Sequence, residues 1–281
     1  MRIEPLVQPL QLTNNGELEI VFIGVGSAFS RILHNTNFLI IKGDNHVLVD
    51  FGTTGPDALP TITGLGLGDI GVILPTHSHC DHIGGIEQLA LWNRYVAMPF
   101  AGKPKLSMII SEDYQEILWN MSLRGGMEWN EINQEGKTLT FTDYFTILRP
   151  KITAHQPRLR MDVTVGDIHI EIFGTNHIPE QATNAGNAFI TYGVLIDGKI
   201  FYSGDTKFDR SLLDMYHPLA EWMFHDTSFI PNPVHASLDE LRTLPEEIKK
   251  KMFLVHYSDV WQNQNVEEFA GLAQQGVRYI F

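Results

Sequence analysis

The chain has 281 residues, of which 43% are hydrophobic, enough to fill a sizeable core in one large domain or two small ones. Its 20 basic and 33 acidic residues give a formal net charge of -13, which opposes non-specific attraction to a long nucleic acid or an anionic membrane. The single cysteine, Cys80, excludes an internal disulfide framework. The N-terminus resembles no signal peptide, and no apolar run reaches the roughly 18 residues of a membrane span, so we expect a cytosolic globular protein.

Short runs rich in Val, Ile and Phe recur along the chain and predict β-strands. These runs lie at 17–25, 37–42, 46–52, 70–77, 168–177, 188–196, 199–206, 222–229 and 252–259. Helical patterns between them lie at about 56–66, 82–96, 111–121, 238–250 and 265–275. No internal repeat or linker divides the chain, so we predict a single domain over residues 1–281.

The dipeptide Asp197-Gly198 lies between two of the predicted strands and is a strong signal for a two-residue hairpin. The predicted sheets are therefore at least partly antiparallel. Because strands dominate and the helices between them must cover outer sheet faces, the pattern favours a layered α/β sandwich.

Histidine and aspartate side chains follow five of the predicted strands within a few residues of their ends. Imidazole nitrogen and carboxylate oxygen are ligands that divalent zinc, manganese and iron accept. Residues at the ends of neighbouring strands converge, so this pattern predicts a metal site. The candidates are Asp50, His77, His79, Asp81, His82, His177, Asp205 and His256.

The motif His77-x-His79-x-Asp81-His82 is the densest part of this pattern. Its two leading histidines are predicted to bind one ion. The next two ligands lie on the first turn of the following helix and point to the other side, where they would bind a second ion. The alternative interpretation is a histidine-rich surface loop.

The other candidates are weaker when each is taken singly. A lone histidine at a strand end, such as His177 or His256, is more often a satisfied polar residue than a ligand. Asp205 could cap a turn, and Asp50 could be a turn residue. Cys80 is interpreted as a packing residue, because it should point away from a metal that its two neighbours coordinate.

Taken in order, these residues resemble the signature of the metallo-β-lactamase-fold hydrolases, from the N-terminal strand to His256. The resemblance implies a four-layer αββα sandwich with two divalent metal ions, zinc in the first place and manganese as the alternative. It assigns one ion to His77, His79 and His177 and the other to Asp81, His82 and His256. It also implies that Asp205 bridges the ions, that Asp50 supports the ligands from behind, and that Asp81 belongs to the catalytic residues.

Two further features resemble the ribonuclease Z-like branch of that family. The segment VFIGVGSAFS at 21–30 resembles its opening strand and glycine loop, and FHDTSF, VHASLDEL and LVHYSD resemble its later motifs. The resemblance implies a catalytic pair of Asp226 and His235, in which the carboxylate raises the basicity of the imidazole that protonates a departing alkoxide. Aspartate stands at 226 where glutamate is expected. The alternative is a surface turn that carries two unrelated polar residues.

The substrate expectation rests on a missing arm. Ribonuclease Z grips tRNA with a basic arm between the positions of His177 and Asp205, but here predicted hairpin strands fill that segment. Without the arm, and with an acidic chain, RNA binding would lack its main electrostatic attraction. The sequence is most similar to cyclic nucleotide phosphodiesterases, which include phage anti-Pycsar proteins and their bacterial relatives. This similarity implies hydrolysis of small 3',5'-cyclic nucleotides to linear nucleotides by a metal-bridging hydroxide.

Three alternatives are considered at this point. They are a tRNA 3'-processing endoribonuclease, a lactonase, thioesterase or arylsulfatase on the same scaffold, and a non-catalytic binding protein that uses the fold to sense a ligand. The last of these predicts that metal-ligating residues are missing, and none is missing here. A longer insertion at about 99–165 carries aromatic and basic residues that either contact the substrate or form a lid or dimer surface. The family resemblance also implies a homodimer.

Overall fold

The computed structural model describes residues 1–281, which divide into two compact units. The first unit comprises residues 1–23, 37–150 and 276–281, and the second comprises 24–36 and 151–275. Each unit is built on one eight-stranded sheet that mixes parallel and antiparallel neighbours. The chain is thus a mixed α/β protein with two large sheets.

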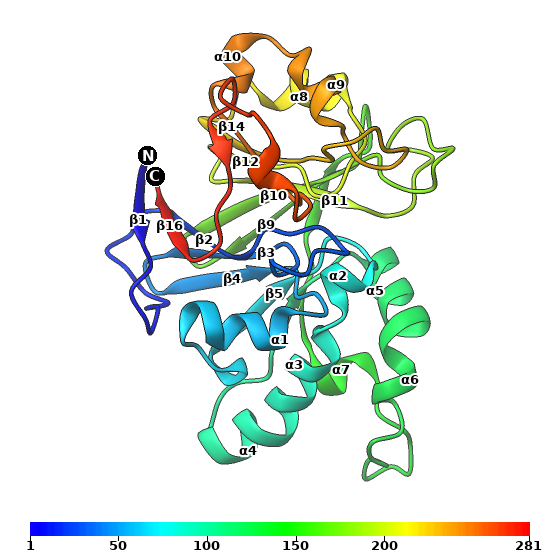
Figure 1. The fold of residues 1–281 in the computed structure, drawn as a ribbon. Helices are drawn as coiled ribbons and strands as arrows, with labels where there is room; N and C mark the ends of the chain where they lie inside the picture. Colours follow the sequence, from blue (N-terminus) through cyan, green and yellow to red (C-terminus); the bar gives the residue numbers. More distant parts are fainter. The chain divides into compact units, whose positions relative to one another are not determined.

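The sheet of the first unit has the order β1-β16-β2-β3-β4-β5-β6-β7. Its strands β2 and β3 are almost continuously apolar, which is why they lie in the buried centre of the sheet. Strand β1 pairs antiparallel with β16, so the two ends of the chain lie side by side (Figure 1). The strands are β1 (Arg2–Pro5), β2 (Glu19–Gly24), β3 (Asn37–Lys42), β4 (Asn45–Val49), β5 (Val72–Leu74), β6 (Ser107–Ile109), β7 (Thr146–Leu148) and β16 (Val277–Ile280).

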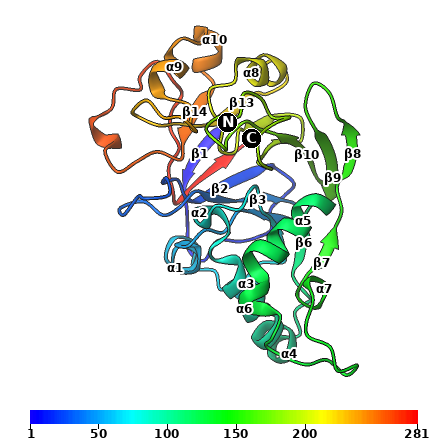
Figure 2. The ribbon, with the colours of Figure 1, turned by 90° about the vertical axis from the view of Figure 1, so that its right-hand side faces the viewer.

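Short helices accompany this sheet, and α1 and α3 lie on the same side of it in both views (Figures 1 and 2). Helix α3 buries Ile86, Leu89 and Ala90, whose spacing forms one apolar helix face. The helices are α1 (Gly55–Ala58), η1 (Leu59–Thr63), η2 (Leu67–Asp69), α2 (Cys80–Ile83), α3 (Ile86–Trp92), η3 (Asn93–Ala97), α4 (Met98–Ala101), α5 (Glu112–Leu118), η4 (Trp119–Leu123), α6 (Arg124–Met127) and α7 (Phe141–Tyr144).

The sheet of the second unit has the order β15-β14-β13-β12-β11-β10-β9-β8. Its antiparallel part contains the predicted hairpin, because Asp197 and Gly198 both adopt positive φ and connect β11 to β12. Strands β12 to β15 are parallel. The strands are β8 (Lys151–Ala154), β9 (Arg160–Val165), β10 (Ile168–Gly174), β11 (Tyr192–Ile196), β12 (Ile200–Tyr202), β13 (Trp222–Asp226), β14 (Met252–Val255) and β15 (Gly271–Leu272).

Three helices lie together on one side of the second sheet (Figure 2). They are α8 (Arg210–Tyr216), α9 (Leu238–Arg242) and α10 (Glu246–Lys249), and a short helical turn, η5 (Trp261–Asn263), follows them in the chain. Their apolar side chains, including Tyr216 and Leu241, form one buried core with Phe201, Met223 and Leu254 of the strands. No helix of the protein has the length and apolar character needed to cross a bilayer.

All nine predicted strand segments contain an observed strand, but the helix predicted at 265–275 is wrong. That segment contains turns and bends at 267–270 and no helix, and Gly271–Leu272 forms a strand that pairs with β14. Gly271 lies at φ +138, which a helix does not permit, and the pairing with β14 is a tertiary contact. Helix α8 was not predicted. Residues 99–165 supply β6 and β7 to the first sheet and β8 and β9 to the second. The single domain with an insertion at these residues stays a prediction.

Gly204 makes the turn that leads from β12 to Asp205, and we expect it to tolerate no side chain. It lies at φ +59, and a Cβ atom there would lie 2.1 Å from the carbonyl oxygen of Tyr192. Gly204→Ala should therefore lower the free energy of unfolding by about 2–4 kcal/mol in a denaturant titration. Gly198→Ala is the control, because Gly198 has a similar φ of +67 but open space, and about 1 kcal/mol is expected. Equal losses would contradict the steric argument.

Candidate metal centre

Asp50 follows β4 and is held in a left-handed turn at φ 60. Its buried carboxylate accepts hydrogen bonds from the backbone N–H of Thr76 at 2.7 Å and from the Thr76 hydroxyl at 2.8 Å. It also lies 2.7 Å from Nδ1 of His82. Burial raises the pKa of Asp50, and the His82 ring opposes that shift. Asp50 therefore does more than form a turn, because it fixes the orientation of the His82 imidazole.

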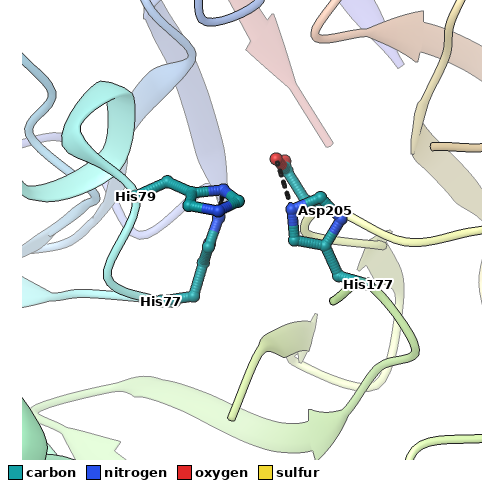
Figure 3. A group of neighbouring side chains, drawn as sticks. All are labelled: His77, His79, His177 and Asp205. Carbon is teal, nitrogen blue, oxygen red and sulfur yellow. Dashed lines mark hydrogen bonds and ion pairs between the residues drawn. The ribbon is translucent and has the colours of Figure 1, made fainter. Parts of the chain in front are cut away.

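The histidine motif lies between β5 and α2 in the first unit. Nε2 of His77 is 3.0 Å from Nδ1 of His79, and Figure 3 shows these two rings close together. Helix α2 contributes Asp81 and His82, with Nε2 of the histidine 3.3 Å from the carboxylate. The structure thus gathers four nitrogen and oxygen donors at the start of one short helix, and only His79 among them is more than slightly exposed.

In the second unit, three strand ends bring their polar residues together around Asp205. His177 follows β10, Asp205 follows β12 and His256 follows β14. Oδ2 of Asp205 lies 3.8 Å from Nε2 of His177 and 3.5 Å from Nε2 of His256. Figure 3 shows the first of these ion pairs as a dashed line. One carboxylate oxygen therefore lies between two imidazoles.

The protonation state of His177 suits a metal ligand. Its Nδ1 donates to the carbonyl oxygen of Val234 at 2.8 Å, which leaves the lone pair on Nε2. Burial lowers the pKa of His177 to about 4, although Asp205 opposes the shift. His177 is therefore neutral near pH 7, which is the form that coordinates metal.

Asp226 and His235 form a close pair in the second unit. Oδ2 of Asp226 is 2.7 Å from Nδ1 of His235, and Oδ1 is 3.3 Å from Nδ1 of His256. Although aspartate is shorter than the glutamate expected at position 226, its carboxylate thus reaches the imidazole of His235. Burial alone would raise the pKa of Asp226, but His235 outweighs it and the pKa falls to about 2. Burial likewise lowers the pKa of His235, but Asp226 outweighs it and raises that pKa above its ordinary value.

Cys80 is not a packing residue, which corrects the sequence interpretation. It is the first residue of α2, and its side chain is exposed to solvent. Sequence reasoning also missed two supporting residues, Thr76 and Asn232. The position of Thr76 directly before the histidine motif was a signal that could have identified it. No sequence pattern points to Asn232. The Asn232 side chain accepts hydrogen bonds from the backbone N–H of Val234 and His235, at 3.0 and 3.2 Å.

Comparison with solved structures identifies the fold. The metallo-β-lactamase fold protein YhfI of Bacillus subtilis, 17% identical, superposes with a TM-score of 0.66 over 94% of this chain and 100% of that chain. The short form of human tRNase Z, 14% identical, gives a TM-score of 0.60 over 93% and 98%. The predicted metallo-β-lactamase fold is confirmed. On this fold, the His and Asp residues are compatible with binding of divalent metal ions.

Sequence comparison then identifies the family. The family model of the anti-Pycsar protein Apyc1 matches residues 18–279. The Apyc1 of Bacillus phage vB_BsuM-Goe3 is 35% identical over 261 residues, which cover 90% of this chain and 92% of that protein. The Apyc1 of Paenibacillus harenae is 33% identical over 244 residues, covering 86% and 90%. The chain belongs to the anti-Pycsar Apyc1 family, which confirms the resemblance to phage anti-Pycsar proteins.

The coupling of Asp226 to His235 predicts a measurable titration. In metal-free protein, Asp226→Asn should lower the pKa of His235, because the neutral amide no longer offsets the cost of burying an imidazolium ion. Imidazole resonances followed by NMR through a pH series measure this pKa directly. An unchanged pKa of His235 in this variant would show that Asp226 does not stabilise the protonated imidazole.

Proposed function

We propose that the protein is a metal-dependent phosphodiesterase that opens small 3',5'-cyclic nucleotides to linear nucleotides. The observation that carries the proposal is the Asp226–His235 pair, because it supplies a proton donor next to the candidate ligands Asp205 and His256. Membership of the anti-Pycsar Apyc1 family supports a small cyclic nucleotide as substrate. The predicted homodimer and cytosolic location stay predictions.

The donor set supports two divalent ions. It consists of imidazoles and carboxylates without a thiolate, which suits zinc or manganese. Divalent ions bound there would lower the pKa of water and offset charge on the phosphoryl oxygens. In the proposal, His77, His79 and His177 hold one ion, Asp81, His82 and His256 hold the other, and Asp205 bridges them.

His235 is proposed as the proton donor to the leaving ribose oxygen. Asp226 occupies Nδ1 of the ring, so Nε2 is the nitrogen that donates. Asp226 raises the pKa of His235 above its ordinary value, which favours the protonated ring that a general acid requires. Its side chain is 18% exposed and therefore accessible to a substrate. In the same pair, Asp226 is a positioning residue, because it acts through the imidazole.

Loss of a proposed ligand should remove both metal and activity. We expect His79→Ala and Asp205→Ala to lower bound metal, measured by elemental analysis, and to reduce hydrolysis of bis(p-nitrophenyl) phosphate by about 100-fold or more. His155→Ala is the control, because His155 is an exposed histidine outside the candidate set. Full activity and full metal content in either ligand variant would refute the binuclear proposal.

A general acid should matter most when the leaving group is poor. His235→Ala is expected to lower kcat for a 3',5'-cyclic nucleotide by about 100- to 10,000-fold, but to affect bis(p-nitrophenyl) phosphate much less, because nitrophenolate departs without a proton. Added imidazole should restore part of the lost activity on the cyclic nucleotide. Equal losses on both substrates would argue against proton donation. Turnover of precursor tRNA, a lactone or an aryl sulfate instead would assign a different hydrolase activity.

A further inference from the structure

A pocket of about 470 Å³ lies in the second unit, and His235 and His256 form part of its wall. The remaining wall comes from residues 27–30, 227–230 and 258–260, together with Asn232. The volume falls within the range of small-molecule sites. The pocket therefore contains the proposed proton donor, His235, on one part of its wall. The rest of the wall has no role in the proposed hydrolysis.

Large apolar side chains line this pocket and remain in solvent. Phe29 is 93% exposed, Ile230 is 68% exposed and Val260 is 51% exposed. They come from three separate segments of the chain. A single exposed apolar residue is common on a protein surface and would need no explanation. Three of them around one pocket indicate a surface that binds an apolar group.

The segment that carries Phe29 is fixed in place. The carboxylate of Asp259 accepts hydrogen bonds from the hydroxyl of Ser30 and from the backbone N–H groups of Arg31 and Ile32, the first of these amides at 2.6 Å. The backbone N–H of Ser27 also donates to the carbonyl oxygen of Tyr257 at 3.1 Å. The backbone is thus held on both sides of Phe29, which reduces the cost of ordering this loop when a ligand binds.

Thr227 forms part of the pocket wall, and its side chain carries a polar group without a hydrogen-bond partner. Thr227 is 1% exposed, and its buried hydroxyl makes no hydrogen bond within the protein. Buried hydroxyls are almost always hydrogen-bonded, so this one is suited to a ligand. Flat apolar contact at the rim and one buried hydroxyl match a nucleobase, which has apolar faces and a polar edge.

We propose that this pocket holds the base of the cyclic nucleotide, with Phe29 stacking on its face and the Thr227 hydroxyl bonding to its edge. The inference rests on the proposed function, since it places the base beside the proposed proton donor. Every base has a π-face, so Phe29 contributes affinity for purines and pyrimidines alike. Selection between bases falls to Thr227.

The experiment compares kcat/KM for a 3',5'-cyclic nucleotide and for methyl riboside 3',5'-cyclic phosphate, which lacks the base. The metal-loaded wild-type protein should prefer the nucleotide by about 5- to 150-fold, the range expected for one stacked base. Phe29→Ala should remove most of this preference by slowing only the nucleotide, and Phe29→Trp should retain it. Thr227→Val should reduce the preference more modestly. Phe100→Ala is the matched control, because Phe100 is 84% exposed and lies outside the pocket wall.

Equal kcat/KM for the two wild-type substrates, or an undiminished preference in Phe29→Ala, would overturn the base pocket and leave the phosphodiesterase proposal standing. If neither substrate is hydrolysed, the proposed phosphodiesterase activity is refuted. Equilibrium binding of the cyclic nucleotide then tests whether the pocket binds the base. Weaker binding by Phe29→Ala than by Phe100→Ala supports the pocket, and equal binding overturns it. If Phe29→Ala dissociates a dimer in light scattering while the preference persists, the rim is a dimer surface and the base pocket is refuted.

Discussion

The carboxylate of Asp205 is buried, and one of its oxygens lies within 4.0 Å of imidazole nitrogens of His177, His235 and His256. A buried carboxylate is costly unless positive charge or hydrogen bonds surround it. In the second unit, β10, β12 and β14 end so that the residues after them converge around this carboxylate. The parallel order of β12, β13 and β14 places these ends at the same edge of the sheet, and the core between sheet and helices holds the edge rigid.

Backbone strain accompanies this arrangement. Asp50 and His256 both adopt left-handed φ values, of 60 and 62, which are uncommon for residues with side chains. Such conformations persist only where surrounding contacts over-determine them, and they cluster at functional sites. Here the contacts are specific: Asp50 bonds to Thr76 and His82, and His256 lies against Asp226. The strain is therefore the consequence of turning polar side chains inward immediately after buried strands.

Chemistry and recognition have different physical demands, and the second unit separates them. The proposed proton transfer needs a buried carboxylate beside an imidazole, which the end of β13 and the following loop supply through Asp226 and His235. The proposed base recognition needs exposed apolar surface on a rigid support, which the glycine loop supplies through Phe29. Asp259 ties that loop to the segment after β14, which carries His256. Affinity for the base can therefore vary through Phe29 without altering the Asp226–His235 pair.

The amino-acid sequence by itself was sufficient for the α/β class, for nine of the sixteen strands and for the histidine motif, because these depend on local periodicity and on dense spacing of ligand types. It also identified the Asp197-Gly198 hairpin, whose turn conformation is a local property of those two residues. The isolated candidates Asp50, His177 and Asp205 were ambiguous, since a single polar residue at a strand end has several uses.

Only the tertiary structure decided the features that depend on residues distant in the chain. It paired Gly271–Leu272 with β14 where a helix was predicted, and it exposed Cys80 at the start of α2. It brought Asp226 within hydrogen-bonding distance of His235, although aspartate is shorter than the glutamate expected there. It also placed Phe29 and Val260 around one pocket. No local pattern encodes such contacts, because they arise when the sheet aligns strand ends that the sequence separates.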